Sequence, residues 1–314
     1  MFFSGQIYVP GRLDVGPARL LSLYDSEDII FNNEFAHAVA SGSQRFLEHN
    51  LLAIGSLYSH VRSPVPTPEL YVAALSHHME ASRLFRRSVK QVTEQNWVAT
   101  LGFAISIVVF QLNICRGNDM QSIMETMFVL RNAAAIAQIL APWYNRSRIR
   151  VLVEGQMHEC DSPTWMAEVI DALNDLEKFN AADVSSDFKQ EHRRNATNAL
   201  RQWVLSMNGY PRAWTHFLWW PANVSKAYLK LLAACDSDAL VVFLHWCAIM
   251  TRAPKRWFLD DWASTVAMAA VRGLGPEWDA NIEWPLRVLG IGPAKTLPGS
   301  RSNATLDNDM TECS

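Results

Sequence analysis

Hydrophobic and polar positions recur with helical spacing along most of the chain, and one stretch is apolar almost throughout. From Gln95 to Cys115 the sequence holds 21 residues without Asp, Glu, Lys or Arg. One side of this stretch is fully apolar at helical spacing; its residues are Val98, Leu101, Ile105, Val108 and Leu112. The stretch exceeds the ~18 residues that can cross a bilayer, so a membrane span is one interpretation.

Polar residues within this stretch favour the other interpretation. Gln111 and Asn113 would lie deep in hydrocarbon if the segment crossed a membrane. A second face, with Thr100 and Ala104, is small and mildly polar. We therefore predict the buried central helix of an all-α domain and no membrane span.

The same periodicity predicts further helices on both sides of this segment. They are expected over residues 32–60, 67–92, 119–140, 163–180, 184–207, 221–235, 237–252, 262–272 and 278–289. The dipeptides Thr67-Pro68 and Ser162-Pro163 place a capping hydroxyl before a proline at the first helical position. Ala141-Pro142 is expected to end one helix, and the aromatic residues before Pro221 are expected to form a packed corner.

Length and composition indicate one large folded unit. The 314 residues are 49% hydrophobic and 19% charged, which is typical of a globular protein. We predict an N-terminal loop over residues 1–11, an all-helical domain over 12–291 and a disordered tail over 292–314, where Pro, Gly, Ser, Asn and Asp dominate.

Charge and aromatic content limit the partners. A net charge of −3 provides no general basic surface, so we expect no direct contact with nucleic acid. Nine of the 12 tryptophans lie between Trp203 and Trp284. That bias suggests a roomy, aromatic-lined interior in the C-terminal third.

The cysteines and the N-terminus predict an intracellular protein. The five cysteines are widely spaced, without a C-x-x-C pair or zinc-ligand spacing, and are interpreted as reduced thiols. The first residues show no basic segment followed by an apolar one, so no secretory signal is predicted.

A search for chemical motifs leaves few enzyme classes. Nucleotide-binding glycine motifs, G-x-S-x-G and H-E-x-x-H are absent. Asp260-Asp261 lacks the third carboxylate of a diphosphate-binding magnesium motif, because Ser264 stands there. His77 and His78 are adjacent, whereas helical metal ligands need a spacing of four. We predict no metal site and no cofactor.

Two blocks carry a resemblance to a known family. Residues 34–111 include a leucine-rich helix end, a short linker and a helix with Phe85-Arg86 before the apolar segment. Residues 243–291 include paired aromatic-Trp dipeptides and a terminal Trp284-Pro285. This pattern resembles the regulatory domain of fungal zinc-cluster transcription factors of the sterol uptake control type, over most of residues 15–291.

The resemblance implies an all-helical regulatory domain with a deep apolar pocket for a sterol-like ligand. Members of that family usually begin with a six-cysteine zinc cluster that contacts DNA, whereas this chain has no cysteine before Cys115. Either it is a regulatory half separated from its DNA-binding half, or it is a stand-alone copy with another use. A regulator is expected in the nucleus.

The expected ligand is a sterol-like or other lipophilic metabolite, held among the C-terminal helices. The predicted lining residues are Trp219, Trp220, Trp246, Met250 and Trp262. His245 is the predicted partner for a ligand hydroxyl. An interaction-only alternative, a homodimer or a pairing with a full-length relative, predicts instead a large exposed apolar patch.

A second alternative is a cytoplasmic, cofactor-free cyclase or isomerase of secondary metabolism acting on a terpenoid or polyketide. A pocket that holds a reactive conformer can catalyse such reactions by positioning alone. The residues expected to act as acid or base are His245, Asp260 and Asp261, because they lie among tryptophans where burial changes a pKa.

Overall fold

The computed structural model describes residues 21, 44–65, 67–114, 119–150, 162–182 and 187–292. Its helices are α2 (Arg45–Arg62), α3 (Pro68–Ser88), α4 (Trp97–Ile114), α5 (Met120–Tyr144), α7 (Pro163–Ala182), α8 (Asp187–Ser206), α9 (Trp214–Asn223), α10 (Lys226–Ala233), α11 (Ser237–Met250), α12 (Trp262–Val271), the short 3-10 helix η2 (Pro276–Trp278) and α13 (Asp279–Leu289). No strand occurs within these ranges, and the predicted all-α class is confirmed.

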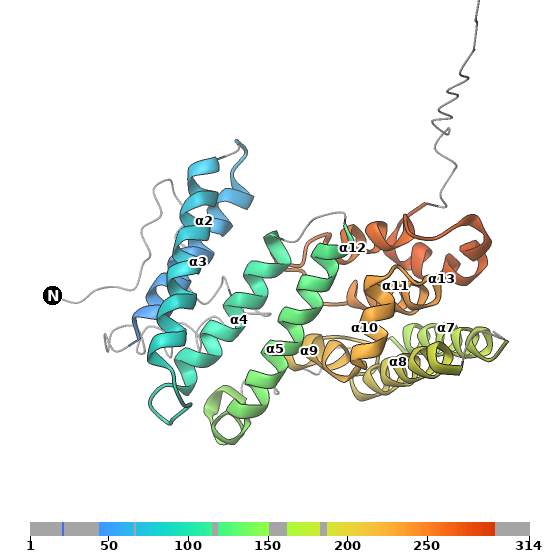
Figure 1. Cartoon of the computed structure of the whole chain (residues 1–314), viewed down its shortest axis with the longest axis horizontal. Helices are drawn as coiled ribbons and strands as arrows, with labels where there is room; N and C mark the ends of the chain where they lie inside the picture. The colour runs from blue at the N-terminus through green and yellow to red at the C-terminus, as the bar shows by residue number, and fades with distance from the viewer. Residues whose placement is uncertain are drawn as a thin grey trace, which may run out of the picture.

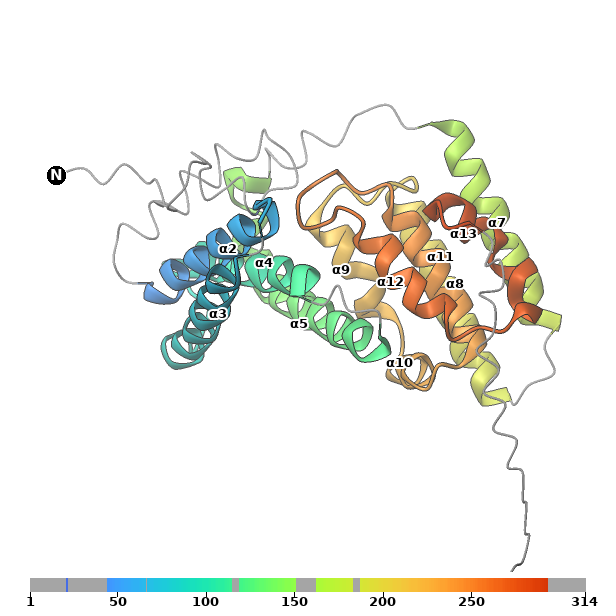
Figure 2. The ribbon, with the colours of Figure 1, turned by 90° about the horizontal axis from the view of Figure 1, so that it is seen from above.

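The helices follow one another across the molecule in chain order. α2 and α3 form a tightly packed pair at one end, α4 and α5 cross the middle, and α7 to α13 make up the other end (Figures 1 and 2). α5 also packs against α9, which joins the middle to the C-terminal part. Buried apolar side chains from α2 through α13 belong to one continuous core.

α4 is buried as predicted, and its polar residues are satisfied within the helix itself. Thr100 and Ser106 are fully buried, and each donates its hydroxyl to the carbonyl one turn earlier, over 2.9 Å and 2.7 Å. Asn113 Nδ2 donates to Val109 O over 2.8 Å. Because side-chain bonds to the i−4 carbonyl remove unpaired polar groups, a helix with these residues can be enclosed on all sides.

α11 is the most completely enclosed helix of the C-terminal part. Every residue from Ala239 to Met250 is buried. Its N-terminus is capped by Asp236, whose carboxylate accepts from Ala239 N over 3.2 Å. α8, α10, α12 and α13 pack around it, so this helix forms the centre of that part of the molecule.

Pro142, which was expected to end one helix, and Pro221, which was expected to begin another, both lie inside helices. α5 continues through Pro142 to Tyr144, and α9 contains Pro221. Both prolines stand in the last turns, where few further backbone bonds are lost. In α9 the buried residues Phe217, Leu218 and Trp220 hold the helical conformation through the core. The predicted helix over residues 221–235 is therefore wrong in its start, because α10 begins only at Lys226.

The predicted N-terminal loop and most of the predicted tail lie outside the described residues. The same holds for residues 32–43 of the helix that was expected over 32–60. The expected domain boundaries at residues 12 and 291 stay a prediction. Within the described part, α13 ends at Leu289 and is followed by Gly290 in the left-handed conformation, with φ 67°.

Among the described residues, two helices have the length and composition of a membrane span. They are α4, 67% buried inside the protein, and α5, whose apolar 18-residue window is 39% buried. α10 and α11, which meet at a bend of 103°, pass the same test only when they are taken together. The expected absence of a membrane span therefore remains a prediction.

Candidate functional site

An apolar groove runs between α4, α5 and α9. α4 contributes Leu101, Ala104, Ile105 and Val108, which share one face at spacings of three and four residues. α5 contributes small and apolar side chains, and α9 closes the groove with Trp214 and Leu218. The cavity has a volume of about 260 Å³, which is close to the lower end of small-molecule sites at about 300 Å³.

Alanines of α5 open the space for this groove. Ala133, Ala137 and Ala141 recur every four residues and line it together with Leu140 and Tyr144. A larger side chain at any of these alanines would enter the cavity, since they face it one turn apart.

Trp214, which lines the groove, carries one unsatisfied polar group. Its Nε1–H is buried and has no hydrogen-bond acceptor among the described residues. The ring is held by stacking on Phe258, with centroids 5.6 Å apart, and by an edge contact with Phe217 at 5.5 Å. A buried donor without a partner is unfavourable by about 1–3 kcal/mol. An oxygen of a bound molecule would remove that penalty.

Arg131 ties the α5 wall of the groove to α9. Its Nη1 donates to Pro221 O over 2.5 Å and to Val224 O over 2.7 Å. These carbonyls lie at the C-terminal end of α9, where a helix has no internal donors left and carries partial negative charge. One guanidinium therefore satisfies the end of α9 and sets its position beside α5.

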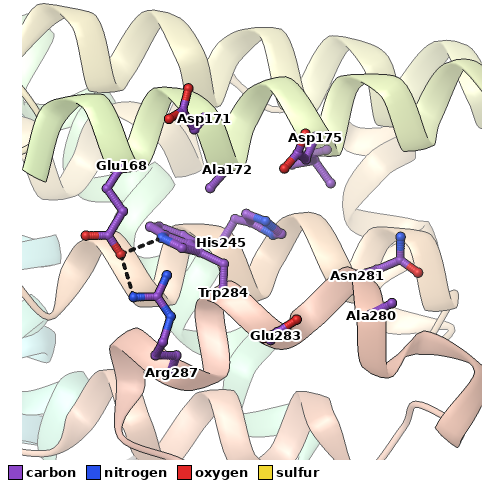
Figure 3. Close-up of a pocket in the computed structure, with 11 residues that line it drawn as sticks. Glu168, Asp171, Ala172, Asp175, His245, Ala280, Asn281, Glu283, Trp284 and Arg287 are labelled. Atoms are coloured by element: carbon purple, nitrogen blue, oxygen red, sulfur yellow. Dashed lines mark hydrogen bonds and ion pairs between the residues drawn. The ribbon is translucent and has the colours of Figure 1, made fainter.

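A second cavity, of about 440 Å³, is polar and lies between α7, α11 and α13 (Figure 3). Glu168, Asp171 and Asp175 come from one face of α7. α13 contributes Glu283, Trp284 and Arg287 across the gap, together with Ala280 and Asn281. His245 of α11 lines the cavity between them, so this predicted residue does face an open space.

His245 is held in one tautomer. Its Nδ1 lies 2.8 Å from Val241 O. Because a carbonyl can only accept, Nδ1 carries the proton and Nε2 carries the lone pair. Burial lowers the pKa of His245 from 6.5 to about 4, and the bond to Val241 opposes this shift. The imidazole is therefore neutral at pH 7 and offers an acceptor at Nε2, which has no partner among the described residues.

Glu168 fixes the end of this polar cavity that lies beside Trp284. Its Oε1 accepts from Trp284 Nε1 over 3.1 Å and pairs with Arg287 Nη1 at 2.9 Å (Figure 3). Trp284 in turn stacks on His245, with ring centroids 5.5 Å apart, and on Trp165 at 6.0 Å. The ring of His245 is therefore fixed from one side by α13.

Three of the predicted lining tryptophans pack against one another. Trp220 stacks on Trp246 at 5.2 Å, and Trp246 meets Trp262 edge to face at 5.8 Å. All three are at most 2% exposed, and none lines the groove or the polar cavity. Trp219 is half-buried and is likewise absent from both linings. In this structure these rings fill the core of the C-terminal part.

The remaining predicted residues line a third cavity, of about 350 Å³. Met250, Asp260 and Asp261 lie there with Lys255 and Ser264. Asp260 also pairs with Arg62 of α2 at 3.8 Å. His245 does not line this cavity, so the structure does not bring the three proposed acid–base residues into one site.

The adjacent histidines His77 and His78 each contact another aromatic ring, and Cys247 lies in the core. His78 stacks on Phe110 at 4.0 Å, and His77 Nδ1 lies 3.0 Å from His49 Nδ1. Cys247 is buried, and burial raises the pKa of its thiol, which keeps the thiol protonated at neutral pH. In the part of the chain that is described, no three His, Cys, Asp or Glu residues are arranged to hold a metal ion.

Signals for both cavities were present in the sequence. The alanines at 133, 137 and 141 form a stripe of small residues on one helix face. The acidic residues at 168, 171 and 175 recur at spacings of three and four. Neither pattern predicts which other helix lies opposite these residues, because that depends on packing between segments far apart in the chain.

Comparison with protein-family models, with curated proteins and with solved structures finds no match to this chain. The resemblance to regulatory domains of the sterol uptake control type thus stays a prediction. The groove and the polar cavity are the structural features that bear on function.

Proposed function

We propose that this domain binds a compact lipophilic molecule that carries an oxygen acceptor, in the groove between α4, α5 and α9. The single observation that supports this most is the apolar lining together with the unpaired Nε1–H of Trp214. Pockets for such ligands are largely apolar with a few polar groups that fix orientation. The ligand oxygen would accept from Trp214 once a small shift of the ring turns its buried Nε1–H toward the groove, while the carbon skeleton of the ligand lies against Ala104 and Ala137.

The size of the groove narrows the ligand class. At about 260 Å³ it accommodates a small terpenoid, or one end of a larger molecule such as a sterol. This keeps the expected class, a lipophilic metabolite, but moves its site from the tryptophans of the C-terminal part to the middle of the molecule. The domain would act as the ligand-sensing part of a transcription regulator, and a partner chain would supply the contact with DNA.

No structural observation of comparable weight supports either alternative function. A catalytic role for His245 with Asp260 and Asp261 lacks a shared cavity. For the interaction-only alternative, the exposed large apolar side chains are distributed over α2, α3, α5, α8 and α12 and the loop after α2. Ligand sensing is therefore the function that the apolar groove supports best.

The test uses pairs of ligands that differ only in the oxygen. Carvone and limonene share a carbon skeleton, but only carvone has a carbonyl. Denaturant unfolding with each compound reports binding, since a ligand at about 100 times its dissociation constant adds about 2.7 kcal/mol of stability. We expect stabilisation by carvone or by a sterol alcohol and a weaker effect of limonene. No stabilisation by any sterol or terpenoid in such a panel would overturn the proposal.

Two pairs of variants assign the binding to the groove. Trp214→Phe should abolish the preference for the ketone, whereas Trp246→Phe should keep it, although both remove a buried indole N–H without a partner. Ala137→Phe should fill the groove and abolish binding. Ala135→Phe, on the exposed face of the same helix, is its matched control. If the two variants of either pair changed ligand binding equally, the ligand would bind outside the groove.

A further inference from the structure

The polar cavity between α7, α11 and α13 has no role in the proposed lipophilic site. It lies apart from the groove and shares no lining residue with it. At about 440 Å³ it falls within the size range of small-molecule sites. Its lining is polar and mostly acidic, whereas the lining of the groove is apolar.

The most informative group in this cavity is His245. The residue is only 3% exposed, yet it lines the cavity, and its Nε2 has no partner among the described residues. Since Nδ1 donates to Val241, Nε2 can only accept. A buried acceptor that opens on a cavity selects a ligand with an N–H or O–H donor.

The charged groups at the rim determine whether the ligand can carry a positive or a negative charge. Four carboxylates line the cavity, from Glu168, Asp171, Asp175 and Glu283, and Arg287 is the single cation in the lining. Arg287 is already paired with Glu168. Asp175 pairs with Lys178 at 2.8 Å, but both side chains are about three-quarters exposed, so water screens this pair. An anionic ligand would be repelled.

We propose that this cavity binds a small organic cation with N–H donors, such as the primary ammonium group of an aliphatic amine. One of the three ammonium protons would be accepted by His245 Nε2, and the other two by two of the carboxylates that line the gap between α7 and α13, which come from Asp171, Asp175 and Glu283 (Figure 3). Such charge-assisted bonds are the strong ones. The site is independent of the lipophilic groove.

Calorimetric titration of the whole chain with 1,4-diaminobutane tests this proposal. We expect saturable binding of one molecule per chain with a dissociation constant of about 1 mM or tighter. The bis-trimethylammonium analogue has the same charge but no N–H donor. It should bind at least about tenfold more weakly, because His245 can accept nothing from it. Equal binding of both ligands, or no saturable binding of the diamine, would overturn the proposal.

Two rim variants and a charge-matched control separate a built site from general attraction to an acidic protein. Asp171→Asn and Asp175→Asn, each on the exposed rim, should weaken diamine binding by about tenfold without loss of fold. Glu191→Gln makes the same change of charge on the exposed surface of α8, outside the cavity, and should leave binding unchanged. Equal weakening by Glu191→Gln would show counterion attraction only and would overturn the site.

Discussion

The imidazole of His245 donates Nδ1–H to the carbonyl of Val241, one turn earlier in α11, over 2.8 Å. This bond fixes the neutral tautomer in a place where burial lowers the pKa to about 4. The charged groups around the cavity are Glu168, Asp171 and Asp175 from α7 and the side chains of Glu283 and Arg287 from α13. His245 therefore connects the stability of the domain with pH.

His245 is expected to make the domain less stable in acid. Its pKa is about 4 in the folded state and 6.5 in the unfolded chain, so between these values the unfolded state binds more protons. Stability then falls as the pH falls, by about 2 kcal/mol between pH 7 and pH 5. Urea unfolding of wild type and His245→Gln at both pH values measures this. Equal acid sensitivity of the two proteins would contradict the assigned pKa.

Arg193 of α8 and Asp238 of α11 form a buried ion pair, with Arg193 only 1% exposed. Asp238→Ala should lower the free energy of unfolding by about 3–5 kcal/mol, because it removes the carboxylate that is paired with a guanidinium in the core. Lys178→Ala removes a partner from the exposed pair with Asp175 and should change stability by less than about 1 kcal/mol. Chemical denaturation compares them, and similar losses would show that burial of Arg193 is not decisive.

Arg131 is expected to support both stability and ligand binding. Arg131→Met keeps the apolar stem but removes the donors to Pro221 O and Val224 O. Leaving these carbonyls unpaired should cost about 1–3 kcal/mol, and it should weaken binding in the groove because α9 loses its fixed position beside α5. The neighbouring Asn132→Ala, on the exposed face, should change stability by less than about 0.5 kcal/mol. A stable Arg131→Met protein with unchanged ligand affinity would contradict this role.

α4 and α5 are expected to remain in the protein interior and not in lipid. α4 is enclosed by α2 and α5, and its buried hydroxyls bond to its own backbone. The chain expressed in cells should therefore stay in the supernatant after high-speed centrifugation without detergent. Sedimentation with membranes that resists an alkaline carbonate wash would show instead that these helices span a bilayer.

Hydrophobic spacing alone determined the helical class, and the reason is local. An apolar stripe such as Val98 to Leu112 is readable because helical periodicity places it on one face whatever the partner. The cap at Asp236 and the glycine after α13 act within one turn of the chain. Pro142 and Pro221 were the exceptions, since both were expected at helix boundaries but lie inside helices that tertiary packing holds.

Only the tertiary structure decided which aromatic and ionisable residues face open space. Trp214 and Trp246 both belong to the tryptophan-rich C-terminal third, yet one lines a groove and the other lies between two further tryptophans. Likewise His245 opens on a cavity formed by α7, whose carboxylates lie some seventy residues away along the chain. A local pattern fixes which face of a helix is apolar, but helices distant in sequence decide whether that face meets a side chain or a cavity.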